Sequence, residues 1–185
     1  MTKRTRTALI GSVLIGALFL MGAGFPTKTT PAHFATGVCT AVQEWSASAN
    51  AGSKELDAKI SAATSIRQVR SLLASYLGNA AKSTSAALDG LDDAGVPKTP
   101  KGAEASKTLK EGFSKIRTAL RGFQDDAEDV SIKNKQKALK QLKALNAKVG
   151  TEFNSFTKSL TKIRSLDPNH KLEKAFKANS VCAAL

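Results

Sequence analysis

The chain is poor in the residues that build metal, redox and catalytic sites. Its 185 residues include only two cysteines, two histidines, one tryptophan and one tyrosine. A structural zinc site needs about four ligands at close spacing, whereas His33 and His170 lie far from each other and from both cysteines. The sequence has neither an EF-hand spacing nor a nucleophile with a convincing base beside it. We therefore expect no metal, no cofactor and no enzymatic activity.

Aromatic residues are also scarce, at 5% of the chain. Alanine, lysine, leucine and serine dominate instead, and this balance favours helices over sheets. Arginines and aromatic residues are not interleaved with the lysines, so we expect no specific recognition of nucleic acid. The length that remains after residue 24 is enough for one domain with its own core.

One apolar run stands out near the N-terminus. Lys3, Arg4 and Arg6 precede an uncharged apolar segment over residues 8–23, which ends in the small residues of Gly22-Ala23-Gly24. This order is typical of a secretory signal peptide at residues 1–24. Because no Arg-Arg pair occurs there, we expect the general secretory route. The alternative is an uncleaved membrane anchor, although the run is shorter than the roughly 20 residues that span a bilayer.

The two cysteines, Cys39 and Cys182, bracket almost all of the exported chain. An exported protein meets an oxidising compartment, in which disulfides form and persist. A bond between these cysteines would close a very long loop, which stabilises a fold by roughly 5 kcal/mol in the chain-entropy account. Free thiols or a bridge between two chains are the alternatives. We expect an intramolecular bond with a structural role.

The segment that precedes Cys39 contains prolines and threonines without an apolar period. We expect a flexible tether over residues 25–36, followed by a helical domain over residues 37–185. The sequence Asn50-Ala51-Gly52 is expected to interrupt the first helix. Ser65 and Gln68 match a capping box, which predicts the start of the second helix.

Two later segments have the clearest helical period. Apolar residues recur there at alternating steps of four and three, which is the spacing of one helix face. The two series are Leu109, Phe113, Ile116, Leu120, Phe123, Ala127 and Val130, and then Leu139, Leu142, Val149, Phe153, Phe156, Leu160 and Ile163. Asn146 fills the slot between Leu142 and Val149; the alternative is that Asn146 lies at the edge of the face and Leu145 packs. Asp167-Pro168 is expected to open a short last helix. We predict an all-α, up-and-down antiparallel bundle that is monomeric and closed by the N-to-C-terminal disulfide; an intermolecular coiled coil is the alternative.

Positive charge is unevenly distributed along the chain. The 28 basic and 15 acidic residues give a net charge of +13. The two kinds balance from Cys39 to Val130, whereas basic residues far outnumber acidic ones from Ser131 to Leu185. On a helical wheel, six lysines of the second half lie within roughly 60° of one line, opposite the apolar residues. These are Lys133, Lys137, Lys140, Lys148, Lys158 and Lys162.

The row of lysines is a candidate contact surface for an anionic ligand outside the cell. Cell-wall polymers and the head groups of a membrane surface carry the complementary charge. A solvated face that only keeps the protein soluble also explains the lysines. The acidic residues Asp125, Asp126, Glu128 and Asp129 are expected to complement the dipole at the start of the following helix rather than to bind calcium.

Several short motifs resemble small secreted helical proteins of actinobacteria. They are the signal segment, G-V-C-T-A-V in the first helix, the turn D-A-G-V-P-K and the terminal A-F-K-A-N-S-V-C. The resemblance spans most of the exported chain and implies an all-helical fold with paired end cysteines and no particular activity. Trp45-Ser46-Ala47 departs from the W-x-G turn of the small helical type VII substrates, so that relationship is not expected.

Together these features predict a secreted, non-enzymatic binding module at the cell surface. A structural component of the envelope is an alternative with the same sequence features. An enzyme whose site is assembled from scattered residues is the other.

Overall fold

The computed structural model describes residues 27–183, without the side chains of Asn146 and residues 153–165. The expected signal peptide at residues 1–24 lies outside this range. Residues 27–183 form six helices and one pair of short strands. In chain order they are β1 (Lys28–Thr29), α1 (Pro31–Ala62), α2 (Ile66–Asp93), β2 (Val96–Pro97), α3 (Gly102–Glu128), α4 (Lys135–Ser165), α5 (Lys171–Ala178) and α6 (Ser180–Ala183). The protein is mostly helical, as its composition predicts.

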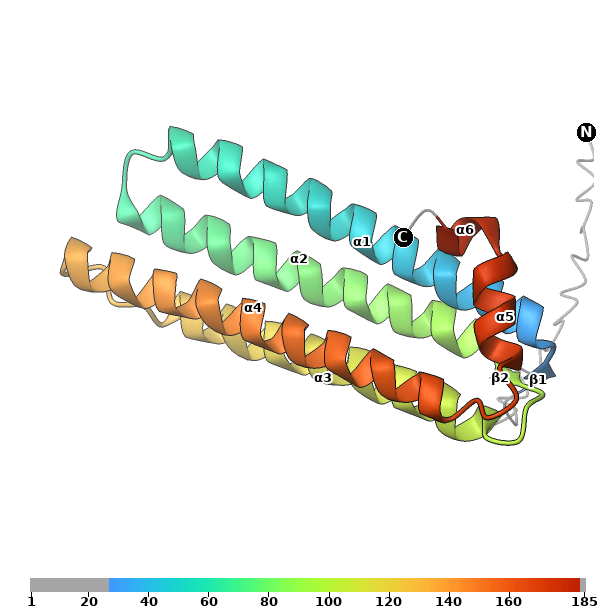
Figure 1. Cartoon of the computed structure of the whole chain (residues 1–185). Coiled ribbons are helices and arrows are strands. Elements are labelled where there is room, and N and C mark those ends of the chain that lie inside the picture. Colours follow the sequence, from blue (N-terminus) through green and yellow to red (C-terminus); the bar gives the residue numbers. More distant parts are fainter. Residues whose placement is uncertain (1–26, 184–185) are drawn as a thin grey trace, which may run out of the picture.

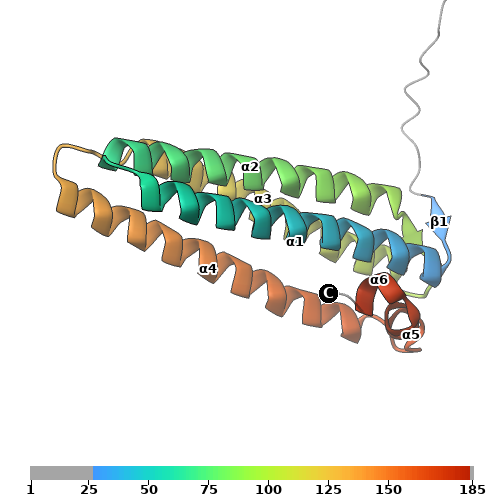
Figure 2. The ribbon, with the colours of Figure 1, turned by 90° about the horizontal axis from the view of Figure 1, so that it is seen from above.

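The four long helices, α1 to α4, lie along a common direction (Figure 1), which they keep in the view turned by 90° (Figure 2). Helix α2 packs against α1 and α3, and α3 also packs against α4. At one end, which we call the clasp end, α5 and α6 pack on α1, and β1 pairs with β2 in parallel. The opposite end, which we call the turn end, carries the α1–α2 and α3–α4 connections.

Helix α1 begins several residues earlier than the sequence predicts. The Thr30 side chain caps it by accepting a hydrogen bond from the His33 N–H at 3.1 Å. Pro31 fits the first turn, because a backbone N–H has no hydrogen-bond acceptor within the helix there. Phe34 is buried, and its ring meets that of Phe176 in α5 edge-on, with centroids 6.4 Å apart. Residues 31–36, which the sequence predicts to be part of a flexible tether, therefore belong to α1 in the structure.

Helix α1 also continues through Asn50-Ala51-Gly52, where the sequence predicts an interruption. Gly52 faces α2 at a point where the Tyr76 ring comes close. A Cβ atom built on this glycine would lie 3.2 Å from Tyr76 Cε2. The glycine therefore makes room for a neighbouring ring and does not end the helix.

A buried polar contact aligns three of the long helices. Trp45 of α1 donates a hydrogen bond from Nε1 to Thr84 Oγ1 of α2 at 3.0 Å, and this fully buried hydroxyl donates to the Ala80 carbonyl at 2.7 Å. The Trp45 indole also meets the Phe113 ring of α3 edge-on, with centroids 5.1 Å apart. Because an unpaired buried hydroxyl would be destabilising, this contact favours one alignment of the helices.

The predicted capping box at the start of α2 is confirmed. Ser65 Oγ accepts a hydrogen bond from the Gln68 N–H at 3.3 Å, and Gln68 Oε1 accepts one from the Ser65 N–H at 3.1 Å. Beyond the other end of α2, Gly95 has a φ of 74°. This conformation suits glycine, which has no Cβ, and it turns the chain toward β2.

Helix α4 packs in a register that differs from the predicted one. Ala138, Leu142 and Leu145 are buried and Val149 is half-buried, so these residues form the seam of α4. Leu139 is 37% exposed, although the four-and-three pattern predicts it to be buried. The predicted series passes over Ala138 and Leu145, and this omission rotates the expected face. The side chains predicted for its second half, from Phe153 to Ile163, lie outside the described residues.

The predicted disulfide between Cys39 and Cys182 is confirmed, with its sulfur atoms 2.06 Å apart. It joins α1 to α6, and Asn179 Nδ2 donates a hydrogen bond to Thr36 Oγ1 of α1 at 2.6 Å. The bond indicates an oxidising compartment outside the cytoplasm. Within residues 27–183, no helix has an apolar stretch of the length that crossing a membrane requires.

Reduction of the disulfide should destabilise the fold strongly. The bond links residues 143 positions apart, so its loss should remove roughly 5 kcal/mol at most and lower the Tm by roughly 10–20 °C. Calorimetry of oxidised and reduced protein measures this change. Thiol titration of the denatured, unreduced monomer provides the control, and two reactive thiols there would contradict the structure.

The register of α4 can be tested with two leucines. Leu120 of α3 is 3% exposed, so Leu120→Ala should destabilise the protein by about 2–5 kcal/mol. Leu139→Ala removes the same atoms from an exposed position of α4 and should change the free energy of unfolding by less than about 1 kcal/mol. Urea unfolding measures both variants. A large loss of stability in Leu139→Ala would mean that Leu139 is buried and that the predicted seam of α4 is correct.

Candidate anionic-ligand surface

The first half of α4 presents a row of exposed lysines, which we call the basic face of α4. It consists of Lys137, Lys140 and Lys143, which lie away from the buried seam, together with Lys135 in the first turn, which lies nearer to that seam. At about 100° per residue, Lys140 lies opposite the buried seam, and Lys137 and Lys143 lie on either side of it. None of the four forms an ion pair or a side-chain hydrogen bond with another residue of the described chain. Their charges are therefore available to a ligand.

The structure places the six predicted contact lysines in different surroundings. Lys137 and Lys140 belong to the basic face. Lys133 is exposed, but it lies in the turn before α4 and not on the helix itself. It adds a further positive charge at the turn end, next to the basic face. Lys158 and Lys162 belong to α4, but their side chains lie outside the described residues. Of the six predicted contact lysines, the structure therefore places Lys137 and Lys140 on the basic face.

The remaining difference concerns Lys148 and Lys143. Lys148 is exposed at the edge of α4 toward α3, where its Nζ lies 3.9 Å from Asp126 Oδ2. Lys143 lies on the basic face, although it is not among the six predicted contact lysines. Both differences follow from the rotated register, because packing of Leu145 turns Lys143 toward solvent and Lys148 toward α3. The available signal was the apolar Leu145 beside the polar Asn146.

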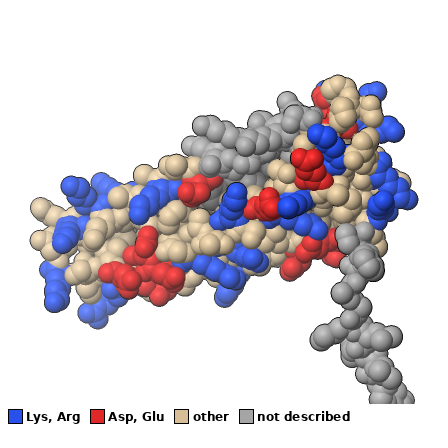
Figure 3. Space-filling model, turned by 90° about the horizontal axis from the view of Figure 1, so that it is seen from below, with Lys and Arg blue, Asp and Glu red and all other residues tan. Residues whose placement is uncertain are grey.

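A group of acidic residues lies at the end of α3, next to the start of α4. Asp125 and Glu128 belong to the last turn of α3, and Asp129 is its C-cap. The prediction that these residues begin the following helix is wrong, since α4 starts only at Lys135. Figure 3 shows basic side chains at the turn end beside an acidic group.

Both charge groups oppose the dipole of their own helix. The last turn of α3 contains acidic residues and no basic one, while the first turn of α4 contains lysines and no acidic residue. Negative charge is unfavourable at a helix C-terminus and positive charge at an N-terminus. Asn134 caps α4 by accepting a hydrogen bond from the Lys137 N–H at 3.0 Å. Helix stability therefore does not explain why lysines occupy this turn.

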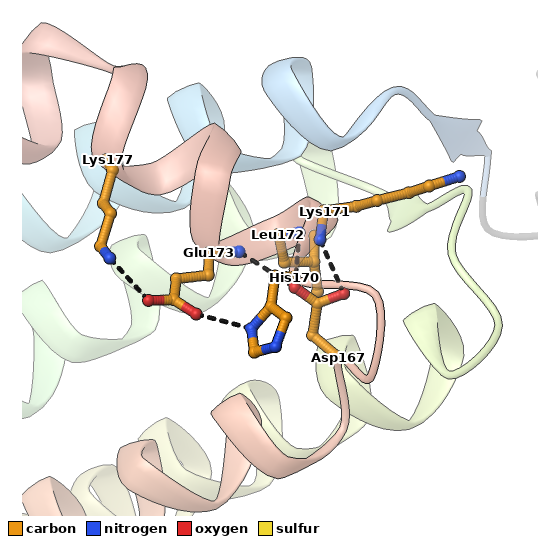
Figure 4. Close-up of polar contacts among 6 residues, drawn as sticks. All are labelled: Asp167, His170, Lys171, Leu172, Glu173 and Lys177. Carbon is orange, nitrogen blue, oxygen red and sulfur yellow. Dashed lines mark hydrogen bonds and ion pairs between the residues drawn. The ribbon is translucent and has the colours of Figure 1, made fainter.

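A second polar cluster lies at the clasp end, around the start of α5 (Figure 4). Asp167 is only 3% exposed, and its two oxygens accept hydrogen bonds from the N–H groups of Lys171, Leu172 and Glu173 at 3.1, 2.7 and 3.0 Å. The predicted cap is thus present, but the helix starts at Lys171 rather than directly after Asp167. The carboxylate serves to hold this helix in place.

Two basic side chains hold Glu173 from opposite sides. Lys177 Nζ lies 2.7 Å from Glu173 Oε1, and His170 Nδ1 lies 2.9 Å from Oε2. The hydrogen bond from Lys177, followed by that from His170, lowers the pKa of Glu173 to about 2. His170 itself has a φ of 53°, which is uncommon for a residue other than glycine. The cluster fixes α5, the helix that brings Phe176 against α1.

Within residues 27–183, no group of three or more histidine, cysteine, aspartate or glutamate residues is placed to hold a metal ion. The chain matches no protein-family profile, no curated protein and no solved structure. What the protein binds is therefore inferred from its own residues. The basic face of α4 is the candidate surface.

The pKa of Glu173 should depend on its two partners. Lys177→Gln should raise it from about 2 toward the ordinary value of 4.5, and His170→Gln should raise it by less, because the Lys177 contact is the larger cause. A depressed carboxyl pKa adds stability above pH 4.5, and this contribution is lost as the pH falls toward about 2. A carbon-13 NMR titration of the carboxyl group measures the pKa. A wild-type midpoint near 4.5 would contradict the structure of the cluster.

Proposed function

We propose that the protein is a secreted, non-enzymatic binding module whose basic face of α4 contacts an anionic polymer at the cell surface. The observation that carries this proposal is the row of four exposed lysines without an acidic partner among the described residues. Lys135 and Lys137 lie in the first turn of α4, where the dipole disfavours positive charge, and this position favours a role in binding over a role in stability. A stripe of like charge attracts polyanions and raises their local concentration.

Export is supported by two independent features. The order of charged, apolar and small residues over positions 1–24 is that of a signal peptide. The disulfide requires an oxidising compartment. We propose the general secretory route, with an uncleaved anchor as the alternative for the N-terminal segment.

The geometry favours a polymer over a lipid surface. The described chain begins at the clasp end, whereas α4 begins at the turn end (Figure 1). A helix of 31 residues is about 45 Å long, so an N-terminal anchor would hold the start of the basic face far from the bilayer. Interfacial helices also insert several large apolar side chains, and Leu139 is the one exposed large hydrophobic residue in the described chain.

We further propose that α1 to α4 form a monomeric up-and-down antiparallel bundle. This arrangement is supported by the short connections between consecutive long helices and by their common direction in Figures 1 and 2. It leaves the basic face on one outer helix. A ligand could then approach the face without any opening of the core.

The proposal predicts salt-dependent binding of a synthetic polyanion. The oxidised protein should bind poly-L-glutamate at low ionic strength, and the affinity should fall steeply as salt is added, because screening and counterion release dominate such contacts. The test variant replaces four lysines by glutamine: Lys135, Lys137, Lys140 and Lys143. It should lose at least about tenfold in affinity, while the Tm changes little because exposed charges contribute little to stability. Fluorescence anisotropy with labelled polymer measures the affinity.

A matched control removes the same number of charges at the clasp end. It replaces four other exposed lysines that also have no acidic partner among the described residues by glutamine: Lys98, Lys101, Lys171 and Lys174. This control should retain most of the affinity. Equal losses in the two variants would show that net charge alone attracts the polymer. Vesicles with anionic lipids form a second arm, and preference for vesicles over polymer at equal charge would contradict the polymer as the partner.

A further inference from the structure

A groove between α2 and α3 carries a separate group of cations. It has a volume of about 440 Å³ and is lined by Ser75, Gly78, Asn79, Ala81, Lys82, Arg121 and Gln124. Two of these residues are cations, and none is a carboxylate. The groove involves no residue of α4, so it is distinct from the basic face.

The two cations of this groove have no acidic partner among the described residues, whereas another cation at the α2–α3 contact does. Lys110 of α3 forms an ion pair with Asp92 of α2 farther toward the clasp end. Lys82 and Arg121 form no ion pair or side-chain hydrogen bond with another described residue. The same holds for Arg117, which lies one turn before Arg121 and therefore on the same side of α3. The α2–α3 contact thus neutralises one cation and leaves three unpaired.

Arg117 adds an independent observation. Its Nε atom is buried and has no hydrogen-bond partner in the described structure. Burying a donor of a charged group without a partner is destabilising, and native proteins rarely leave such donors unpaired. A guanidinium group in this state gains most from an anion that reaches it.

Gly78 of α2 allows Gln124 of α3 to pack closely beside it at the groove. A Cβ atom at Gly78 would lie 2.8 Å from Gln124 Oε1, which is closer than such atoms approach. The amide of that glutamine is held from the other side, since its Nε2 donates a hydrogen bond to Glu128 Oε1 at 3.0 Å. The absence of a side chain at Gly78 therefore lets the Gln124 amide lie close to the α2 backbone, where it forms one side of the groove.

We infer that this groove binds a phosphate group. The planar guanidinium of Arg121 can donate two parallel hydrogen bonds to phosphate oxygens, and Lys82 supplies a second charge. Asn79 and Ser75 provide neutral donors on the α2 side. A bound phosphate draws the guanidinium of Arg117 toward the groove, where its Nε gains an acceptor. The group can come from the free ion or from a phosphate-bearing polymer, and this inference does not depend on the basic face of α4.

The test is a titration of the oxidised full chain with inorganic phosphate, against chloride at equal ionic strength. Nitrogen-15 NMR follows the arginine Nε–H signals. The Arg117 and Arg121 signals should shift in a saturable manner, and that of Arg67, which is exposed near the start of α2, should not. Arg121→Gln should weaken the affinity by at least about tenfold, as expected for loss of a charged hydrogen bond. The matched control Arg67→Gln should leave it unchanged.

A second arm uses long-chain polyphosphate and distinguishes the two sources. Binding of inorganic phosphate itself identifies a site for the free ion. Binding of the polymer alone, with the same loss in Arg121→Gln, identifies a polymer site. The inference is overturned if neither probe shifts the Arg121 signal, or if Arg67→Gln weakens binding as much as Arg121→Gln. Because Arg121 is exposed, its variant is expected to fold, and circular dichroism checks this.

Discussion

The seam between α4 and α3 is the constraint on which the proposed function depends. A helix has one rotational setting once its apolar side chains are packed, and here Ala138, Leu142 and Leu145 set it. The opposite side must then face solvent, and it carries Lys137, Lys140 and Lys143. Rotation by about 40°, which is the difference between the predicted and observed registers on a helical wheel, would exchange Lys143 for Lys148. Core packing therefore determines which charges a ligand meets.

Each part of the bundle has its own stabilising contacts. The middle of the bundle is aligned by Trp45 and Thr84, and the clasp end is held by the disulfide and by Asp167. At the turn end, Arg70 of α2 donates a hydrogen bond to the Val130 carbonyl at 3.2 Å. The lysines and acids around this turn oppose the helix dipoles instead of supporting them. The lysines there have no acidic partner among the described residues, so the turn end is suited to contact with another molecule.

Much of the fold can be predicted from local sequence chemistry. The capping box at Ser65 and the pairing of Cys39 with Cys182 each depend on few residues and are confirmed. Errors occur where long-range packing overrides a local signal. Gly52 does not end a helix because a ring from α2 fills the space, and Phe34 orders the presumed tether because α5 covers it.

The candidate site could be predicted only in part. An excess of lysine in the second half of the chain is visible in the sequence, but the selection of individual lysines requires the true seam. The position of that seam depends on whether Leu145 or Asn146 is assigned to the buried face of α4. The groove between α2 and α3 has no sequence signature, because Lys82 and Arg121 lie far apart in the chain and meet only through helix packing.

The most direct test of the central claim is lysine footprinting with and without a polyanion. An amine-acetylating reagent is applied to the oxidised protein at low salt, in the presence or absence of poly-L-glutamate, and mass spectrometry reports the modification of each lysine. The account predicts selective protection of Lys135, Lys137, Lys140 and Lys143, with Lys98 and Lys107 modified at unchanged rates. Uniform protection of all exposed lysines, or protection confined to the clasp end, would contradict it.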